Sequence, residues 1–111
     1  MDERARRVGR NEALFREVNE RLEGLHDAVD DGSATDPYLC ECGDPDCSEQ
    51  IELTREEYER VRSDPALFAI VPGHEHSDVE QIVETNDRFD IVRKQADDAE
   101  EMAAELDPRS N

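Results

Sequence analysis

Three cysteines lie within the eight-residue stretch CECGDPDC at positions 40–47, and the chain of 111 residues contains no others. In an extended chain, residues i and i+2 point to the same face, so the thiols of Cys40 and Cys42 can approach one ion together. The Gly-Asp-Pro sequence that follows is typical of a turn, and this turn would bring Cys47 back toward the first two cysteines. The spacing therefore predicts a thiolate-rich metal site.

A tetrahedral zinc site needs four ligands, so the three cysteines require one more. The candidate histidines are His26, His74 and His76. His74 is preferred because it directly follows a Pro-Gly turn at the end of an apolar run, where metal ligands commonly lie. His76 is the second choice, and a water molecule the third. Zinc is the expected metal because thiolate-rich tetrahedral sites select it.

Other interpretations of the cysteines remain open at this point. They could be redox-active thiols, or incidental, although buried structural cysteines favour apolar surroundings and this stretch is polar. A zinc ion with an open position could serve a small hydrolase with Glu75 as general base. A [2Fe-2S] site of the CDGSH type shares the C-x-C start and a Pro-x-Cys element, but its spacing differs. The order of residues does not fit a zinc deaminase.

Composition limits the possible partners. The formal net charge is −18, from 31 acidic and 13 basic residues. Proteins that bind nucleic acids or anionic membranes gain affinity from lysine and arginine, so both classes of partner are disfavoured. No apolar stretch approaches the length of a membrane span, and the first residues, MDERARRVGR, lack the apolar segment of a secretory signal. We expect a cytoplasmic protein whose thiols stay reduced.

The N-terminal part, residues 1–33, is predicted to be an amphipathic helix over residues 8–30. Apolar side chains recur there at alternating spacings of three and four, as in a heptad repeat. After Val8 and Asn11, the stripe continues through Phe15, Val18, Leu22, Leu25 and Val29. This stripe could pack on the protein's own core. Alternatively, it could bind a protein partner or a second copy of the chain.

The middle part, residues 34–95, is predicted to be the folded core. We expect strands at 38–40 and 50–53, a central strand at 67–71 and a hairpin that turns at TNDR and continues through 89–94. Thr54 and Glu57 form the pattern of a capping box, which predicts a helix that Pro65 stops. Ser77 and Glu80 form a second such pattern, which predicts one or two turns of helix, while residues 79–84 fit a helix and a strand about equally. The remaining part, residues 96–111, is predicted to be an acidic helix or a partly disordered tail.

Several segments of this chain resemble a group of small uncharacterised bacterial proteins. The resemblance rests on RNEALFREVNER (10–21), LCECGDPDC (39–47), IELTREEYERVR (51–62), VPGHE (71–75) and AAELDP (103–108). It implies that Cys40, Cys42, Cys47, His74 and Glu75 belong to one recurrent pattern. It implies no activity.

Together these observations predict an α+β fold. A small, mostly antiparallel sheet would carry the cysteine loop, residues 40–47, which zinc would hold in place. The N-terminal helix and the acidic C-terminal helix or tail would flank this sheet. The expected function is that of a non-enzymatic, cytoplasmic zinc-binding interaction or regulatory module with a structural Cys3His site. The alternative is a redox or metal sensor that uses the same cysteines.

Overall fold

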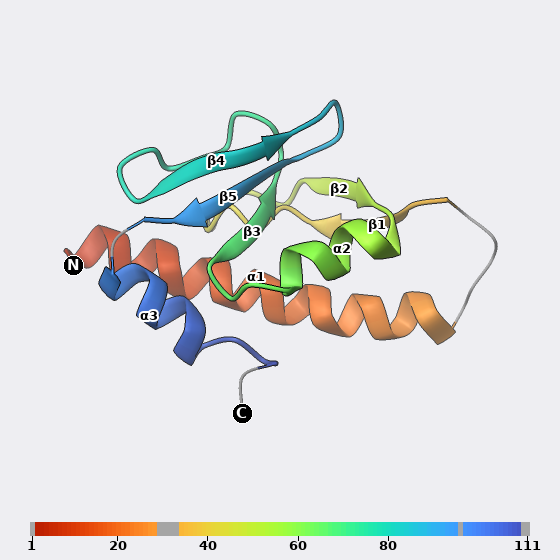
Figure 1. Cartoon of the computed structure of the whole chain (residues 1–111), viewed down its shortest axis with the longest axis horizontal. Coiled ribbons are helices and arrows are strands. Elements are labelled where there is room, and N and C mark those ends of the chain that lie inside the picture. The colour runs from red at the N-terminus through yellow and green to blue at the C-terminus, as the bar shows by residue number, and fades with distance from the viewer. Residues whose placement is uncertain (1, 29–33, 96, 110–111) are drawn as a thin grey trace.

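Three helices and two small antiparallel sheets make up the computed structural model, which describes residues 2–28, 34–95 and 97–109 (Figure 1). In chain order the elements are α1 (Glu3–Ala28), β1 (Asp36–Leu39), β2 (Gln50–Leu53), α2 (Arg55–Arg62), β3 (Leu67–Ile70), β4 (Glu80–Thr85), β5 (Asp90–Lys94) and α3 (Asp97–Glu105). The predicted α+β class is confirmed, as are a helix at the N-terminus and one near the C-terminus. The division of the chain into three parts stays a prediction.

Helix α1 is longer than the sequence predicts at its N-terminal end. It begins at Glu3 because the side chain of Asp2 accepts a hydrogen bond from the backbone N–H of Ala5, at 2.7 Å, and so caps the first turn. The helix runs beneath both sheets and contacts β1 and α3 (Figure 1). Among the residues that the structure describes, no helix is long and apolar enough to cross a membrane.

The most buried face of α1 differs from the apolar stripe that the sequence predicts. Phe15, Val18 and Leu22 are only partly buried, Leu25 is 62% exposed, and Val29 lies outside the described residues. The buried face consists instead of Ala5, Val8, Glu12, Ala13, Arg16 and Asn19. Its polar members are tolerated because they find partners in the core. Arg16, for example, donates to the carbonyl oxygens of Pro65 and Ala103 at 2.7 and 2.8 Å.

The first sheet pairs β1 with β2 and contributes one side of the core. Tyr38 lies opposite Ile51 in the register, and both are buried. The ring of Tyr38 stacks on that of Tyr58 from α2, with 4.5 Å between ring centroids. This stacking ties α2 to the sheet and fixes the strand that leads into the cysteine loop.

The second sheet has the strand order β3-β5-β4. The predicted hairpin is confirmed as β4 and β5, but β3 lies at an edge, so the prediction of a central strand at 67–71 is wrong. The outer edge of β3 is covered by the cysteine loop, where the N–H of Glu41 donates to the carbonyl oxygen of Ala69 at 2.8 Å. The alternating side chains of β3 enter two different core clusters, Ala69 one and Phe68 and Ile70 the other. Both faces of β3 are therefore buried, and its sequence is as apolar as that of a central strand.

The short helix predicted after Ser77 is not formed. Residues 77–79 make a turn, and β4 begins at Glu80. The Glu80 carboxylate does accept a backbone N–H, from His76 at 3.0 Å. The chain beyond it pairs with β5, however, and the other oxygen of Glu80 lies 3.3 Å from the buried ammonium of Lys94. The Glu80 side chain therefore makes a local contact with the backbone, similar to that of a capping box. The residues that follow form a strand and not a helix, because they pair with β5.

The capping box at the start of α2 is confirmed. Thr54 Oγ1 accepts the N–H of Glu57 at 3.1 Å, and Glu57 Oε1 accepts the N–H of Thr54 at 2.7 Å. The same carboxylate accepts two hydrogen bonds from Arg88, at 2.6 and 2.9 Å. The Arg88 guanidinium, aided by the Thr54 N–H, lowers the pKa of Glu57 from its ordinary 4.5 to about 2.

This lowered pKa leads to a prediction about pH. We expect Glu57→Gln to destabilise the protein by about 0.5–1 kcal/mol at pH 7, since the amide keeps the cap but loses the charge that Arg88 faces. The folded-state pKa lies below the unfolded one, so this contribution is complete above pH 4.5 and declines as the pH falls toward 2. Thermal melts of both proteins between pH 7 and 3 should show their difference shrinking. The neighbouring Glu56→Gln should change little, and equal effects of the two substitutions would contradict the assignment to Arg88.

Candidate metal centre

The first two cysteines lie on a segment that joins the two sheets. Cys40 directly follows β1, and its N–H donates to the carbonyl oxygen of Glu49 at 2.9 Å, which extends the pairing with the β2 side by one residue. The next residue, Glu41, pairs with β3 as described above. Beyond Cys42 the chain turns, and the turn closes where the N–H of Cys47 donates to the carbonyl oxygen of Asp44 at 3.0 Å.

Gly43 allows this turn to lie directly against α1. Its φ is +79°, a left-handed conformation that favours glycine. A Cβ atom here would lie only 2.7 Å from the carbonyl oxygen of Val8 and 2.9 Å from Cγ of Glu12. The Asn11 side chain also donates to the carbonyl oxygen of Gly43 at 3.0 Å. The cysteine loop is therefore held by the helix as well as by both sheets.

His74 reaches the loop from the end of β3. The Pro-Gly turn at 72–73 has its glycine at φ +91°, and the N–H of His74 donates back to the carbonyl oxygen of Val71 at 3.0 Å. This reversal places the imidazole beside the cysteines, as the sequence predicts for His74.

The four side chains form a compact donor cluster. One ligand atom from each of Cys40, Cys42, Cys47 and His74 lies within 4.8 Å of all the others. His74 Nδ1 is 3.6 Å from the sulfur of Cys40 and 3.7 Å from that of Cys47. With Zn–S near 2.3 Å and Zn–N near 2.0–2.1 Å, a tetrahedral shell separates sulfur and nitrogen by about 3.6 Å. All three cysteines are free thiols, so the group could hold a metal ion.

The protein around the cluster favours negative charge on one of the three sulfurs, that of Cys42. The N–H of Val71 donates to the sulfur of Cys40 at 3.2 Å. A hydrogen bond from the Cys40 thiol lowers the pKa of Cys42 to about 5, with help from the backbone N–H of Asp44. The same Cys40–Cys42 hydrogen bond, together with burial, raises the pKa of Cys40, and burial raises that of Cys47. A bound cation would displace the remaining thiol protons and complete the set of thiolates.

Glu49 lies beside the imidazole of His74. One of its carboxylate oxygens lies 3.1 Å from Nε2, on the side of the ring away from the sulfurs. A proton on Nε2 would face this carboxylate, which would leave Nδ1 to present its lone pair to a metal ion in the cluster. Carboxylates hold metal-binding histidines in this way at many metal sites. Nothing in the spacing of Glu49 marks it in the sequence.

We expect Glu49→Ala to weaken metal binding by about tenfold, the lower end of the range for such partners, because its side chain is 61% exposed. Competition with a chromophoric chelator would measure the affinity. Asp46→Ala removes the same charge from an exposed position on the same loop and should have less than half this effect on a logarithmic scale. If both substitutions weaken binding equally, the effect is general electrostatics and Glu49 does not orient the ring.

The other candidate residues lie outside the cluster. His76 Nε2 is 2.6 Å from the carbonyl oxygen of Cys42, and His26 Nε2 is 2.9 Å from that of Pro37. Glu75 lines a shallow hollow of about 200 Å³ beside His74 and His76. One of its carboxylate oxygens is buried without a hydrogen-bond partner among the described residues.

Glu41 lies inside the cysteine motif, and its role is structural. It is fully buried, and its carboxylate accepts hydrogen bonds from Arg62 at 2.8 Å, from Asn19 at 2.7 Å and from the N–H of Ala69 at 3.0 Å. These donors come from α2, α1 and β3. The alternation of an extended chain predicts the direction of the Glu41 side chain. If Cys40 and Cys42 point to one face, the residue between them points to the opposite face.

Comparisons with known proteins add no family to this description. No protein-family model matches the chain, and neither does any curated protein or solved structure. The resemblance to small bacterial proteins therefore stays a prediction, and the case for function rests on the geometry of the site.

Proposed function

We propose that this protein is a non-enzymatic zinc-binding module in which Cys40, Cys42, Cys47 and His74 bind one structural Zn²⁺ ion. The observation that carries the proposal is the separation of 3.6 and 3.7 Å between His74 Nδ1 and two of the sulfurs. These distances match the edge of a tetrahedral zinc shell of about 3.6 Å. Two sulfur–nitrogen pairs of the cluster thus already have the spacing that a zinc shell requires.

The donor set supports zinc and a structural role. Three thiolates and one imidazole suit Zn²⁺ better than the oxygen-preferring cations. Four protein ligands complete a tetrahedral shell, whereas a catalytic zinc keeps a position for water or substrate. This argues against the hydrolase with Glu75 as base. The free thiols favour a reducing compartment, for which we infer the cytoplasm.

An interaction or regulatory role is the second element of the proposal. Leu14 and Leu25 on α1 are 53% and 62% exposed, and such leucines could contact a protein partner or a second copy of the chain. Leu22, from the predicted stripe, packs against the protein's own core. The zinc would hold the cysteine loop against α1 and so keep this surface in place.

Elemental analysis of protein purified without chelator or metal-affinity resin tests the proposal. We expect about one zinc per chain in the wild-type protein. His76→Ala should retain this zinc, and His74→Ala should lose most of it. The two variants form a matched pair, because each removes one of two neighbouring histidines. If the purified protein contains iron and is coloured, the site is an iron–sulfur site and not a zinc site. A metal-free protein that also fails to take up added zinc would overturn the proposal.

A thiol-based sensor is the second candidate, and the accessibility and acidity of the thiols favour it. Cys47 is only partly buried, and its sulfur lies within 4.8 Å of that of the buried Cys42, whose pKa is lowered to about 5. An oxidant could reach the first thiol, and the second would supply a thiolate to close a disulfide. One hydrogen peroxide would take two electrons from two thiols, leaving a disulfide and two waters. We expect a sensor to release zinc under mild peroxide, to regain it with reductant and to keep its helical circular dichroism. Zinc retained throughout would exclude this role.

A further inference from the structure

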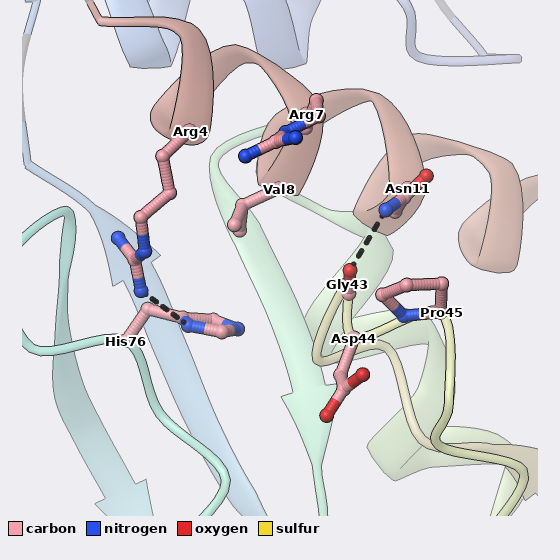
Figure 2. Close-up of a pocket in the computed structure, with 8 residues that line it drawn as sticks. All are labelled: Arg4, Arg7, Val8, Asn11, Gly43, Asp44, Pro45 and His76. Carbon is pink, nitrogen blue, oxygen red and sulfur yellow. Dashed lines mark hydrogen bonds between the residues drawn. The ribbon is translucent and has the colours of Figure 1, made fainter.

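A second site lies on the other side of the cysteine loop. A pocket of about 290 Å³ opens between the first turns of α1 and the loop (Figure 2). Helix α1 supplies Arg4, Arg7 and Asn11 to its walls, and the loop supplies Gly43, Asp44 and Pro45. His76, which is not among the clustered donors, closes one side.

Positive charge gathers here in an otherwise acidic chain. Residues 4–10 contain four arginines and no acidic residue. Arg4 and Arg7 are three positions apart on the helix, so they lie on the same face, and both line the pocket. Arg7 makes no hydrogen bond or ion pair with any residue that the structure describes. In a protein with 31 acidic residues, an arginine beside a pocket and without a carboxylate partner suggests an anionic ligand.

Arg4 is positioned by His76. The Nε2 atom of His76 lies 2.6 Å from the carbonyl oxygen of Cys42, so Nε2 carries the proton. Nδ1 then accepts a hydrogen bond from the Arg4 guanidinium at 3.2 Å, as Figure 2 shows. Asp78 also pairs with Arg4, but both side chains are about half exposed, and such a pair is weak. An incoming anion can therefore share or replace Asp78 at little cost.

The remaining walls indicate the kind of molecule. Val8 and Pro45 form an apolar surface beside the arginines. The carboxylate of Asp44 also borders the pocket, but in Figure 2 it points away from both guanidinium groups. A small molecule that combines an anionic group with an apolar body suits these walls and this volume.

We propose that this pocket binds the phosphate group of a small phosphate monoester, with Arg7 as its principal contact and Arg4 at the rim. The planar guanidinium of arginine matches phosphate oxygens with two parallel hydrogen bonds. The inference rests on the proposed function in one respect: the zinc would hold the loop that forms one wall. Free inorganic phosphate would use the same contacts, and the test separates the two sources.

The test titrates the zinc-loaded, full-length protein with inorganic phosphate and, separately, with glycerol 3-phosphate, at an ionic strength held constant with sodium chloride. Amide chemical shifts report the site. We expect saturable shifts at Arg7, Asn11, Gly43 and His76, with the monoester bound more tightly than inorganic phosphate. Equal affinities would point to free phosphate as the ligand. Arg7→Ala should weaken binding by about 10-fold or more, the loss typical of a charge-assisted pair.

Arg6→Ala is the matched control. It removes the same charge from the adjacent residue, which is exposed and does not line the pocket, and we expect it to change affinity by less than about twofold at this ionic strength. Absence of saturable binding, or equal losses in the two variants, would overturn the inference. Zinc content is measured on the same samples. A protein that holds zinc and fails to bind phosphate overturns this site alone, whereas a protein that never takes up zinc overturns the proposed function.

Discussion

Removal of zinc by a chelator at pH 7 is expected to abolish the cooperative thermal unfolding of this protein, or to lower its melting temperature by tens of degrees. A structural zinc site contributes roughly 10–16 kcal/mol of apparent binding free energy in small zinc domains. A domain of this size has a total stability of only about 5–15 kcal/mol. The cysteine loop is hydrogen-bonded to α1, to β3 and to Glu49 just before β2, so loss of its anchor affects contacts across the core.

Circular dichroism melts before and after chelation, and after zinc is restored, would measure this effect. Recovery on adding zinc separates metal loss from irreversible damage. Cys42→Ser removes one donor whose side chain is buried, so this variant should melt low without chelator and respond little to it. If the wild-type melt does not change when its metal is removed, the site does not stabilise the fold.

Substitution of Glu41 by alanine is expected to destabilise the protein by about 3–5 kcal/mol, the usual result of breaking a buried ion pair. Glu41 and Arg62 each have only 1% of the side chain exposed. Without the carboxylate, the Arg62 guanidinium is left buried and uncompensated, and Asn19 and the N–H of Ala69 each lose an acceptor. Equilibrium unfolding in urea, with zinc present, would measure the loss.

Glu84→Ala is the matched control for Glu41→Ala. Glu84 also pairs with an arginine, Arg60, but those side chains are 40% and 49% exposed, so its loss should cost about 0–1 kcal/mol. Zinc affinity is the second readout. Because Glu41 lies between two of the proposed ligands, Glu41→Ala should weaken zinc binding, while Glu84→Ala should not. Equal stability losses with unchanged zinc affinity would show that Glu41 does not position the loop.

The sequence predicted those elements whose signals are local. The capping box at Thr54 and Glu57, the hairpin turn and the strand at 50–53 all depend on residues a few positions apart, and all are confirmed. The order of strands depends on which segments meet across the chain. For this reason the sequence pattern alone predicts a central position for β3 and a helix after Ser77, and the structure shows neither.

The candidate site shows the same division. The cluster of three cysteines and His74 was predicted, because the cysteines are close in sequence and His74 follows a recognisable turn. The buried polar partners were not predicted. Glu12, for example, accepts a hydrogen bond from Lys94 at 2.7 Å, although the two residues are 82 positions apart in the chain. Burial raises the pKa of Glu12, and the negative charge of nearby Glu80 raises it further. A helical pattern that assigns charged residues to solvent cannot anticipate such a pair.

The cysteine loop also protects the edge of the second sheet. It covers the outer backbone of β3, whose sequence is LFAI, through the hydrogen bond between Glu41 and Ala69. An uncovered apolar strand at a sheet edge is a template for pairing with other chains, and such pairing leads to aggregation. If zinc holds the loop in place, its loss would expose this strand. The metal would then determine whether the protein stays dispersed at high concentration, in addition to whether it stays folded.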